Sequence, residues 1–559
     1  MSAEIPTLPP SNRKARLLGR LLFFVPAVLL LLLFLDFSQN LELPIARGRE
    51  AMVFRYQLDG EEGFILNQAL RLKSGKGLYP PISEAPYLVD NYPPLFPWLW
   101  SLFVDPEAPS LSGGRGMALF FAWLAAFAPM GFLLMHSISG ERDEDFTCDI
   151  NCPFCRCPGL LPAILLGFLC CIFFLSFYSV LRWMAYARVD MPALALSLWG
   201  LVFFGLYRRF PRAAMIASAC AFVAALFFKQ TAIAAPAACL LYLLIVNRRH
   251  ALWYFIALLL AVLAPVGILC LFTGGRYWLH TITYNRNAMR WTEVWNVWLP
   301  HLWRLYHWLL LATLTAVAGA TFCRLVFRKK PAFPLAMWLA LLYGAFNLLS
   351  LTSLAKAGSA ENYLLEPLMA LVLLTGVSML FLFPEPRGGN VERLGQYYSG
   401  LRGAILVVSI LMLFVYGMHY KSRLSIFTSW PRPSTQAMQA GNHVLKVLRE
   451  HPGDVLCEDP IYTILSDRPV LFQHFIMSQL QAEGRWDDSD MVRRTENREF
   501  SLIQAHTDLR STAGHYNRFT PAMREAISTH YTLLEKPMSR PFQLQPIWLY
   551  LPREKAISD

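Results

Sequence analysis

The stretch RYQLDGEEGFILNQALRLKSGKGLYPPISEAPYLVDNYPPLFPW, residues 55–98, lies between two long apolar runs and decides how the rest of the chain is read. It opens with three carboxylates in four positions, Asp59, Glu61 and Glu62, next to glycines, and it closes on the turn-rich segment YPPLFP. Ionisable groups close to hydrocarbon are disfavoured and commonly mark functional sites. These acids therefore call for a functional explanation.

Composition places the chain in a membrane. Its 559 residues are 55% hydrophobic and 16% charged, and several apolar runs reach about 20 residues, the length of a bilayer-spanning helix. The net charge of +12 raises the question of nucleic-acid binding. Most Lys and Arg residues lie in short connections between apolar runs, however, where they set membrane topology. We therefore expect a polytopic membrane protein that binds no nucleic acid.

Eleven apolar segments are predicted to cross the bilayer as helices, which gives an all-α membrane fold. They are residues 17–36, 116–137, 159–181, 191–207, 213–228, 231–247, 251–273, 307–326, 333–354, 363–383 and 403–420. The first segment follows basic residues, as a signal peptide would, but it is long and no small-residue cleavage site follows it. We interpret it as a retained anchor.

Charge in the connections predicts the topology. With a cytoplasmic N-terminus, the inner connections are residues 138–158, 208–212, 248–250, 328–330 and 387–402, and all but the first are basic. An odd number of spans then places the chain after residue 420 outside the cytoplasm. The Asp59 loop, Arg188 with Asp190, Lys229, residues 274–301 and residues 356–366 all fall on that outer side, so the polar groups converge on one face.

The predicted domains are residues 1–420, which form the membrane-spanning catalytic part, and residues 421–559, which form a small extracytoplasmic α/β domain. Within the first, residues 37–115 form a large extracytoplasmic loop. Apolar residues at helical spacing in GFILNQALRLKSG indicate an amphipathic helix lying along the membrane interface. In the tail, residues 435–451 and the segment beginning Thr520-Pro521 read as helices. VLCED, PVLF, FSLIQAH and PIWLYLPR read as strands.

The first-loop acids have two readings. A carboxylate that opens an extracytoplasmic helix is suited to act as a general base on an acceptor hydroxyl. Acids at a helix N-terminus also favour its dipole without any further role. The local sequence around Glu61 does not separate these readings.

Polar and charged groups in four later segments extend the candidate site. Arg188-Val189-Asp190 begins the fourth span, where the pair is either a substrate contact or an ordinary helix start with Asp190 near the N-cap. Lys229 lies between two apolar runs too close for a real loop, so it either snorkels to the interface or has an anionic partner.

Two further segments carry polar groups at the outer ends of spans. Lys356, Asn362 and Glu366 surround the start of the tenth span, and Glu366 falls about a turn inside its apolar helix, where a charge is costly unless it is paired or hydrated. Arg276 belongs to the basic and aromatic loop 274–301, which suits a lipid headgroup or a phosphate equally well.

Four cysteines cluster in the first inner connection, Cys148, Cys152, Cys155 and Cys157. Thiols stay reduced in the cytoplasm, so free thiols or a structural zinc site are both favoured over disulfides. Nothing in the sequence ties this cluster to the outer-face groups.

The order and common sidedness of these motifs resemble the GT-C superfamily of membrane glycosyltransferases. The motifs are the acidic pair before Gly63, YPPLFP, RVDM at residues 188–191, KQTAIAAP at residues 229–236 and ENYLLEP at residues 361–367. The chain is most similar to the bacterial branch related to protein O-mannosyltransferases and lipid A aminoarabinose transferases.

The resemblance implies a sugar donor linked to polyprenyl phosphate, transfer at the outer side of the inner membrane, and an inverting single displacement onto a lipid, glycan or protein acceptor. The family's acidic pair is usually Asp-Glu, with the Asp proposed as base; here it reads Glu61-Glu62, with Asp59 two residues earlier. We expect Glu61 to be the base, with Asp59 and Glu62 as alternatives.

The resemblance also assigns the remaining groups. Phosphate contact is expected from Arg188, Lys229, Lys356 and Arg276, and sugar-hydroxyl contact from Asp190, Asn362 and Glu366. No cofactor is required, although a divalent cation assists some family members.

Two other functions compete with this reading. A transporter or flippase of a lipid-linked or small polar substrate also uses intramembrane charges, but it spreads them through the midplane and often shows an internal repeat. A structural or sensory membrane protein would leave the first-loop acids without a purpose.

Overall fold

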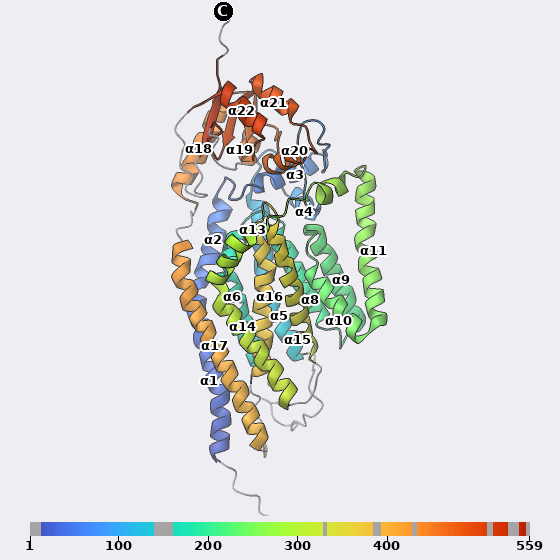
Figure 1. Ribbon diagram of the computed structural model, residues 1–559, viewed down its shortest axis with the longest axis vertical. Coiled ribbons are helices and arrows are strands. Elements are labelled where there is room, and N and C mark those ends of the chain that lie inside the picture. Colours follow the sequence, from blue (N-terminus) through green and yellow to red (C-terminus); the bar gives the residue numbers. More distant parts are fainter. Residues whose placement is uncertain are drawn as a thin grey trace, which may run out of the picture.

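The computed structural model describes residues 13–138, 160–327, 333–383, 393–427, 433–510, 518–534 and 547–554. Long helices form a bundle, and a smaller α/β domain covers one end of it (Figure 1). The cysteine cluster at residues 148–157 lies outside the described residues.

Each predicted span coincides with one apolar helix. The bundle helices are α1 (Arg13–Ser38), α5 (Ser112–Ile138), α6 (Leu160–Ser176), α8 (Asp190–Phe204), α9 (Pro211–Phe228), α10 (Ala234–Val246), α11 (Arg248–Phe272), α14 (Leu299–Phe327), α15 (Leu335–Ser350), α16 (Leu365–Leu382) and α17 (Arg393–Phe427). In the described ranges, eight helical segments are long and apolar enough to cross a membrane, and α6, α8 and α10 are shorter apolar helices. The protein is thus a multi-pass membrane protein, and the count of eleven spans stays a prediction.

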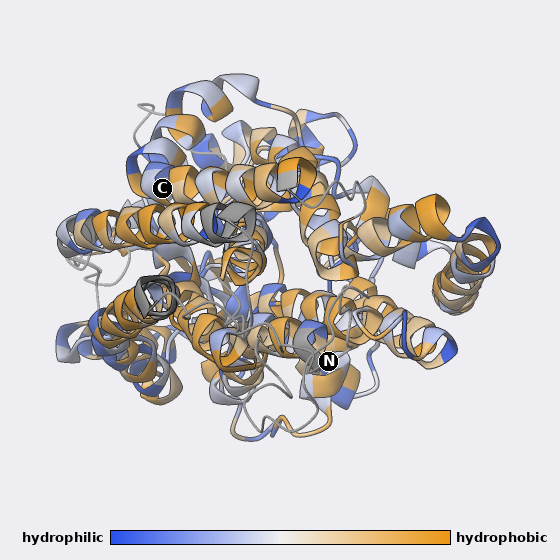
Figure 2. Ribbon diagram, turned by 90° about the horizontal axis from the view of Figure 1, so that it is seen from below, coloured by the Kyte–Doolittle hydropathy of each residue, from blue (hydrophilic) through white to orange (hydrophobic). Residues whose placement is uncertain are grey.

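Hydrophobic residues predominate along these helices (Figure 2), and many of them are exposed, among them Phe120, Leu244 and Leu260. A helix that is apolar all round is stable only when lipid or protein surrounds it. Helix α11 is the extreme case, because it stands apart from the bundle beside α9 and α10 (Figure 1). In its most apolar stretch, 0% of the residues are buried.

Short helices connect the bundle helices at the end that the α/β domain covers. They are α2 (Glu42–Val53), α3 (Glu62–Lys73), α4 (Leu95–Ser101), α7 (Tyr178–Trp183), α12 (Arg276–Trp278) and α13 (Trp291–Glu293), with the helical turns η1 (Gln39–Leu41), η2 (Leu279–Thr283), η3 (Val294–Trp298), η4 (Leu351–Ala355) and η5 (Glu361–Leu364).

The predicted interfacial helix of the first loop exists as α3, but it lies inside the protein. Phe64, Ile65 and Leu66 are buried, and α3 packs between α4 on one side and the α/β domain on the other. Its apolar face therefore meets protein where the sequence indicated lipid.

The predicted helices and strands of the α/β domain form in their predicted order with one exception, and three further helices that were not predicted lie between β1 and β2. It contains α18 (Thr435–Glu450), β1 (Asp454–Cys457), α19 (Pro460–Leu465), α20 (His474–Ala482), α21 (Ser489–Glu496), β2 (Phe500–Ala505), α22 (Pro521–His530), β3 (Tyr531–Leu533) and β4 (Trp548–Pro552). The sheet order is β1-β2-β4-β3, with β1 parallel to β2 and the other pairs antiparallel. Thr520 caps α22 by accepting a hydrogen bond from the Met523 backbone N–H, as its sequence predicts.

The exception is PVLF, residues 469–472, which forms no strand of this sheet. Its last residue, Phe472, instead makes an isolated parallel bridge to Tyr87 of the first loop. The segment pairs with a distant part of the chain, which is why local sequence could not place it.

Candidate active site

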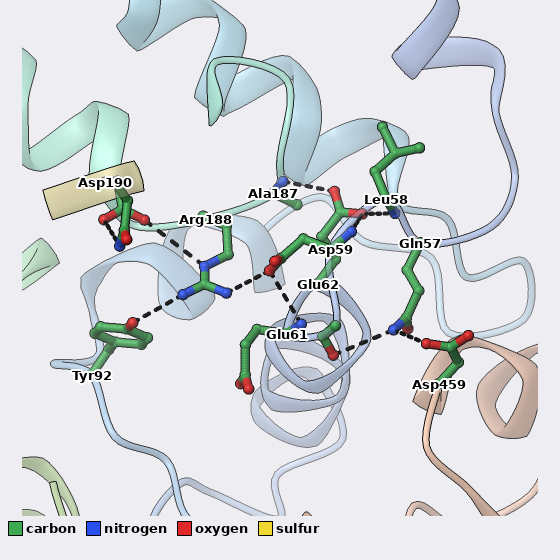
Figure 3. A network of polar contacts seen from close by, with 12 residues as sticks. Gln57, Leu58, Asp59, Glu61, Glu62, Tyr92, Ala187, Arg188, Asp190 and Asp459 are labelled. Carbon is green, nitrogen blue, oxygen red and sulfur yellow. Dashed lines mark hydrogen bonds and ion pairs between the residues drawn. The ribbon is translucent and has the colours of Figure 1, made fainter. Parts of the chain in front are cut away.

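Charged side chains from three segments form one continuous network, part of which is drawn in Figure 3. The Asp59 Oδ1 atom accepts a hydrogen bond from Arg188 Nη1 at 2.5 Å. Arg188 Nε lies 3.8 Å from Asp190 Oδ2, and Lys229 Nζ lies 2.6 Å from Asp190 Oδ1. The first loop, the start of α8 and the end of α9 therefore meet, as their predicted common sidedness requires.

Asp190 is the node of this network rather than a helix cap. Helix α8 begins at Asp190, its N-cap is Val189, and no side chain caps it. Asp190 Oδ1 accepts hydrogen bonds from Lys229 at 2.6 Å and from Asn362 Nδ2 at 2.9 Å. Its Oδ2 atom is buried without a hydrogen bond within the described residues.

Lys229 has the anionic partner that its buried position requires, and that partner is Asp190. Burial lowers the pKa of Lys229, but Asp190 and the nearby Tyr363 and Tyr92 outweigh it, so the pKa is raised and the ammonium stays charged. The Lys229 Nζ atom also lies 5.2 Å from the centre of the Tyr363 ring, a cation–π distance.

Glu62 is fully buried, and both of its carboxylate oxygens accept hydrogen bonds. Arg115 binds it through two nitrogens, Nε to Oε1 at 2.9 Å and Nη2 to Oε2 at 2.8 Å. The backbone N–H groups of Ala187 and Leu58 donate to the same carboxylate. The Arg115 guanidinium also donates hydrogen bonds to the backbone carbonyls of residues 51, 54 and 56. This arrangement locks the first loop to α2, α5 and the loop before α8.

Glu61 is the least constrained of the three first-loop acids. In the part of the chain that the structure describes, its one side-chain donor is Gln473, whose Nε2 lies 3.3 Å from Glu61 Oε2. Figure 3 shows its carboxylate turned away from that of Asp59. Burial raises the pKa of Glu61 above its usual range, Arg188 opposes that shift, and Asp59 adds to it. A carboxylate with a raised pKa is a stronger base than an ordinary one.

Lys356 is a cation without a carboxylate partner among the described residues. Its Nζ donates to Asn285 Oδ1 at 2.9 Å. Burial and the charge of Lys229 lower the pKa of Lys356 to about 8. Two ammonium groups that repel each other in a partly buried place are stabilised when an anion binds between them.

The remaining predicted residues lie at different distances from the network. Asn362 belongs to it through Asp190. Glu366, in the first turn of α16, accepts a hydrogen bond from Tyr343 Oη at 3.2 Å and feels the charge of Lys229. Arg276, at the start of α12, is exposed and lies outside the hydrogen-bonded network.

Three residues of the site were missed in the sequence. Arg115 stands alone at the start of the second span, Tyr92 accepts a hydrogen bond from Arg188 Nη2 at 3.1 Å, and Gln473 comes from the α/β domain. A single arginine beside the glycines of SGGRG was a usable signal for Arg115. Nothing in the local sequence distinguishes Gln473 from the other glutamines of the chain.

A large apolar groove opens beside the site. It has a volume of about 1430 Å³ and lies between α9, α11 and the first loop. Ala219 and Ala224 of α9 and Ala257 of α11 line it, together with Tyr79 and Pro94 of the first loop. Because Tyr79 Oη donates to the Tyr92 carbonyl, the groove ends next to the residue that touches Arg188.

Metal ligands do not gather in the described ranges. No group of three or more His, Cys, Asp or Glu side chains there is arranged to hold a metal ion. The residues present supply instead one basic carboxylate and several cations. This set suits proton removal from an acceptor together with stabilisation of a leaving anion.

No protein-family model matches the sequence, and a comparison with proteins of curated function finds no match. Solved structures of ArnT from Cupriavidus metallidurans are similar to the chain. ArnT is the lipid A aminoarabinose transferase, a GT-C enzyme. The structure bound to undecaprenyl phosphate has 12% sequence identity and a TM-score of 0.50, over 92% of this chain and 97% of that chain. The apo structure has 10% identity and a TM-score of 0.48 over the same shares. The likeness to the structure bound to undecaprenyl phosphate shows an ArnT-like fold, in agreement with the predicted fold.

Proposed function

Starting from a GT-C-like fold, we propose that the protein is a membrane glycosyltransferase that moves a sugar from a polyprenyl-phosphate donor to an acceptor hydroxyl. The observation that carries the proposal is the meeting of a basic first-loop carboxylate, Glu61, with cations from three later segments at one end of an apolar bundle. The ArnT structure of similar fold is bound to undecaprenyl phosphate, which supports the class of donor.

The reaction needs one base and no general acid. Glu61 takes the proton of the acceptor hydroxyl while its oxygen forms a bond to the anomeric carbon of the sugar. The bond between that carbon and the phosphate oxygen breaks, and the phosphate leaves with the electron pair. Phosphate is a weak base and needs no proton to leave. A single displacement of this kind inverts the anomeric centre.

The cations of the site stabilise the leaving phosphate. Lys356 is best suited, because no carboxylate among the described residues neutralises it, and Arg188 and Lys229 reinforce it from the network around Asp190. Arg276 meets the phosphate only from the exposed rim. Asp190, Asn362 and Glu366 then orient sugar hydroxyls, and the buried Oδ2 of Asp190 is a ready acceptor. A divalent cation is not needed for this step.

The apolar groove between α9 and α11 holds the polyprenyl tail in this proposal. It is lined mainly by apolar side chains at the depth of the membrane spans, so a hydrocarbon chain fits its chemistry. Its outer end lies at the segment that carries Tyr92, which brings the lipid phosphate towards Arg188. The site then faces the outer side of the inner membrane, with the N-terminus cytoplasmic.

The test uses membranes that contain the full-length protein and a donor with a labelled sugar. Glu61→Gln is expected to lower transfer by about 100-fold or more, because an amide cannot take the proton, while the amount of protein stays normal. Glu483→Gln, which removes an exposed acid that pairs with Arg485, is the control. Full transfer by Glu61→Gln and by Asp59→Asn would refute the assignment of the base. A donor that crosses the membrane without forming a new glycosidic bond would identify a flippase instead.

A further inference from the structure

Gln473 of the α/β domain lies where that domain meets the first loop. Its backbone N–H donates to the Tyr87 carbonyl at 2.9 Å, and the Tyr87 N–H donates to the Leu471 carbonyl at 2.8 Å. These paired hydrogen bonds hold residues 471–473 against the loop. The Gln473 side chain is 2% exposed, so it belongs to the interior of the protein.

The orientation of the Gln473 amide is fixed by its neighbours. The backbone N–H of Val89 donates to Gln473 Oε1 at 2.8 Å. Since a backbone N–H can only donate, the oxygen of the amide must face Val89. The Nε2 atom is then left to face Glu61, whose Oε2 lies 3.3 Å away. The amide cannot turn over without losing both hydrogen bonds.

The chemistry of this contact suits a base. A neutral amide donates one hydrogen bond to a carboxylate without adding a positive charge next to it. A lysine or arginine in the same place would lower the basicity of Glu61 far more. The charged groups that face Glu61 are Asp59 and Arg188 on one side and Arg518 of the α/β domain on the other.

We propose that Gln473 is a positioning residue that holds the Glu61 carboxylate towards the acceptor, so that the α/β domain completes the active site. This inference rests on the proposed function, because it assumes that Glu61 is the base. A purely structural role, a clip between domain and loop, predicts the same contacts with Tyr87 and Val89 but no effect on the titration of Glu61.

The discriminating variant is Gln473→Glu in the full-length protein. A glutamate keeps an acceptor for the Val89 N–H and replaces the donor to Glu61 with a second carboxylate. Repulsion between the two acids raises the pH at which the pair gives up its second proton. We expect the acid limb of the kcat profile for sugar transfer to move up by about one pH unit or more. Asp490→Ala is the matched control, because it removes the acceptor of the Tyr87 hydroxyl at the same interface, 2.8 Å away, without facing Glu61.

An acid limb that stays at the wild-type pH in Gln473→Glu overturns the inference. If that variant does not fold, as judged by gel filtration in detergent, Gln473→Met gives the same test, because losing the donor also moves the limb upward. Transfer that persists in Glu61→Gln overturns the base and Gln473 together. An inactive Glu61→Gln with an unmoved limb in the Gln473 variant overturns the role of Gln473 alone.

Discussion

Glu61 and Glu62 are neighbours with the same side chain, yet their surroundings differ in almost every respect. Glu62 accepts hydrogen bonds from Arg115 and from backbone N–H groups and has no room for a ligand. Glu61 has a neutral amide as its partner and a raised pKa. Their order in the sequence could not assign these roles, because both face groups that are distant along the chain.

Replacing Arg115 tests the structural role of Glu62. Removing one partner of a buried ion pair leaves the other charge buried and unpaired, which costs about 3–5 kcal/mol. We therefore expect Arg115→Ala to lower the melting temperature in detergent sharply and to reduce the yield of monodisperse protein. Arg493, an exposed arginine of α21 that pairs with Asp490 and Glu499, is the control. If Arg493→Ala lowered the melting temperature as much as Arg115→Ala, the ion pair between Arg115 and Glu62 would not be a main source of stability for the first loop.

At the scale of elements, the helices of the bundle were predictable from the sequence. The contacts between the first loop and the α/β domain were not. Apolar runs of membrane-spanning length are recognisable in a sequence without knowledge of the fold. The bundle helices therefore agree with the predicted spans. The burial of α3 and the pairing of Phe472 with Tyr87 depend on the α/β domain folding back over the first loop. Such long-range contacts leave no local pattern, which is why Gln473 was missed. The sequence did single out Asp59, Arg188, Asp190 and Lys229, which the structure brings into one network.

The groove between α9 and α11 makes a prediction about these two helices. Ala224→Trp places a large side chain in the groove, so it should raise the KM for a long-chain polyprenyl-phosphate donor while leaving a short-chain donor nearly unaffected. The matched control is Leu260→Trp, at a lipid-facing position of α11 that is 61% exposed and outside the groove. Both variants are measured by transfer from donors that share one sugar and differ in chain length. An equal loss with both donors would show that the groove does not hold the tail.

At the scale of the whole molecule, the α/β domain and the candidate site lie at the same end of the bundle, and the basic connections 208–212 and 248–250 join helices at the opposite end (Figure 1). The positive-inside rule places basic connections in the cytoplasm. The two observations together predict that the site faces the outer side of the membrane, where the proposed polyprenyl-linked donor and an envelope acceptor would meet.

Sidedness is testable with one cysteine at each end of the molecule. Lys446 is an exposed residue of α18, and Arg248 is an exposed residue at the start of α11. A thiol reagent that cannot cross membranes should label Lys446→Cys in intact cells and Arg248→Cys only after the membrane is opened. The wild-type protein gives the background from its own cysteines, of which Cys220 is exposed. The opposite labelling pattern would place Glu61 and its cations in the cytoplasm, and transfer to an outer-face acceptor would then be impossible.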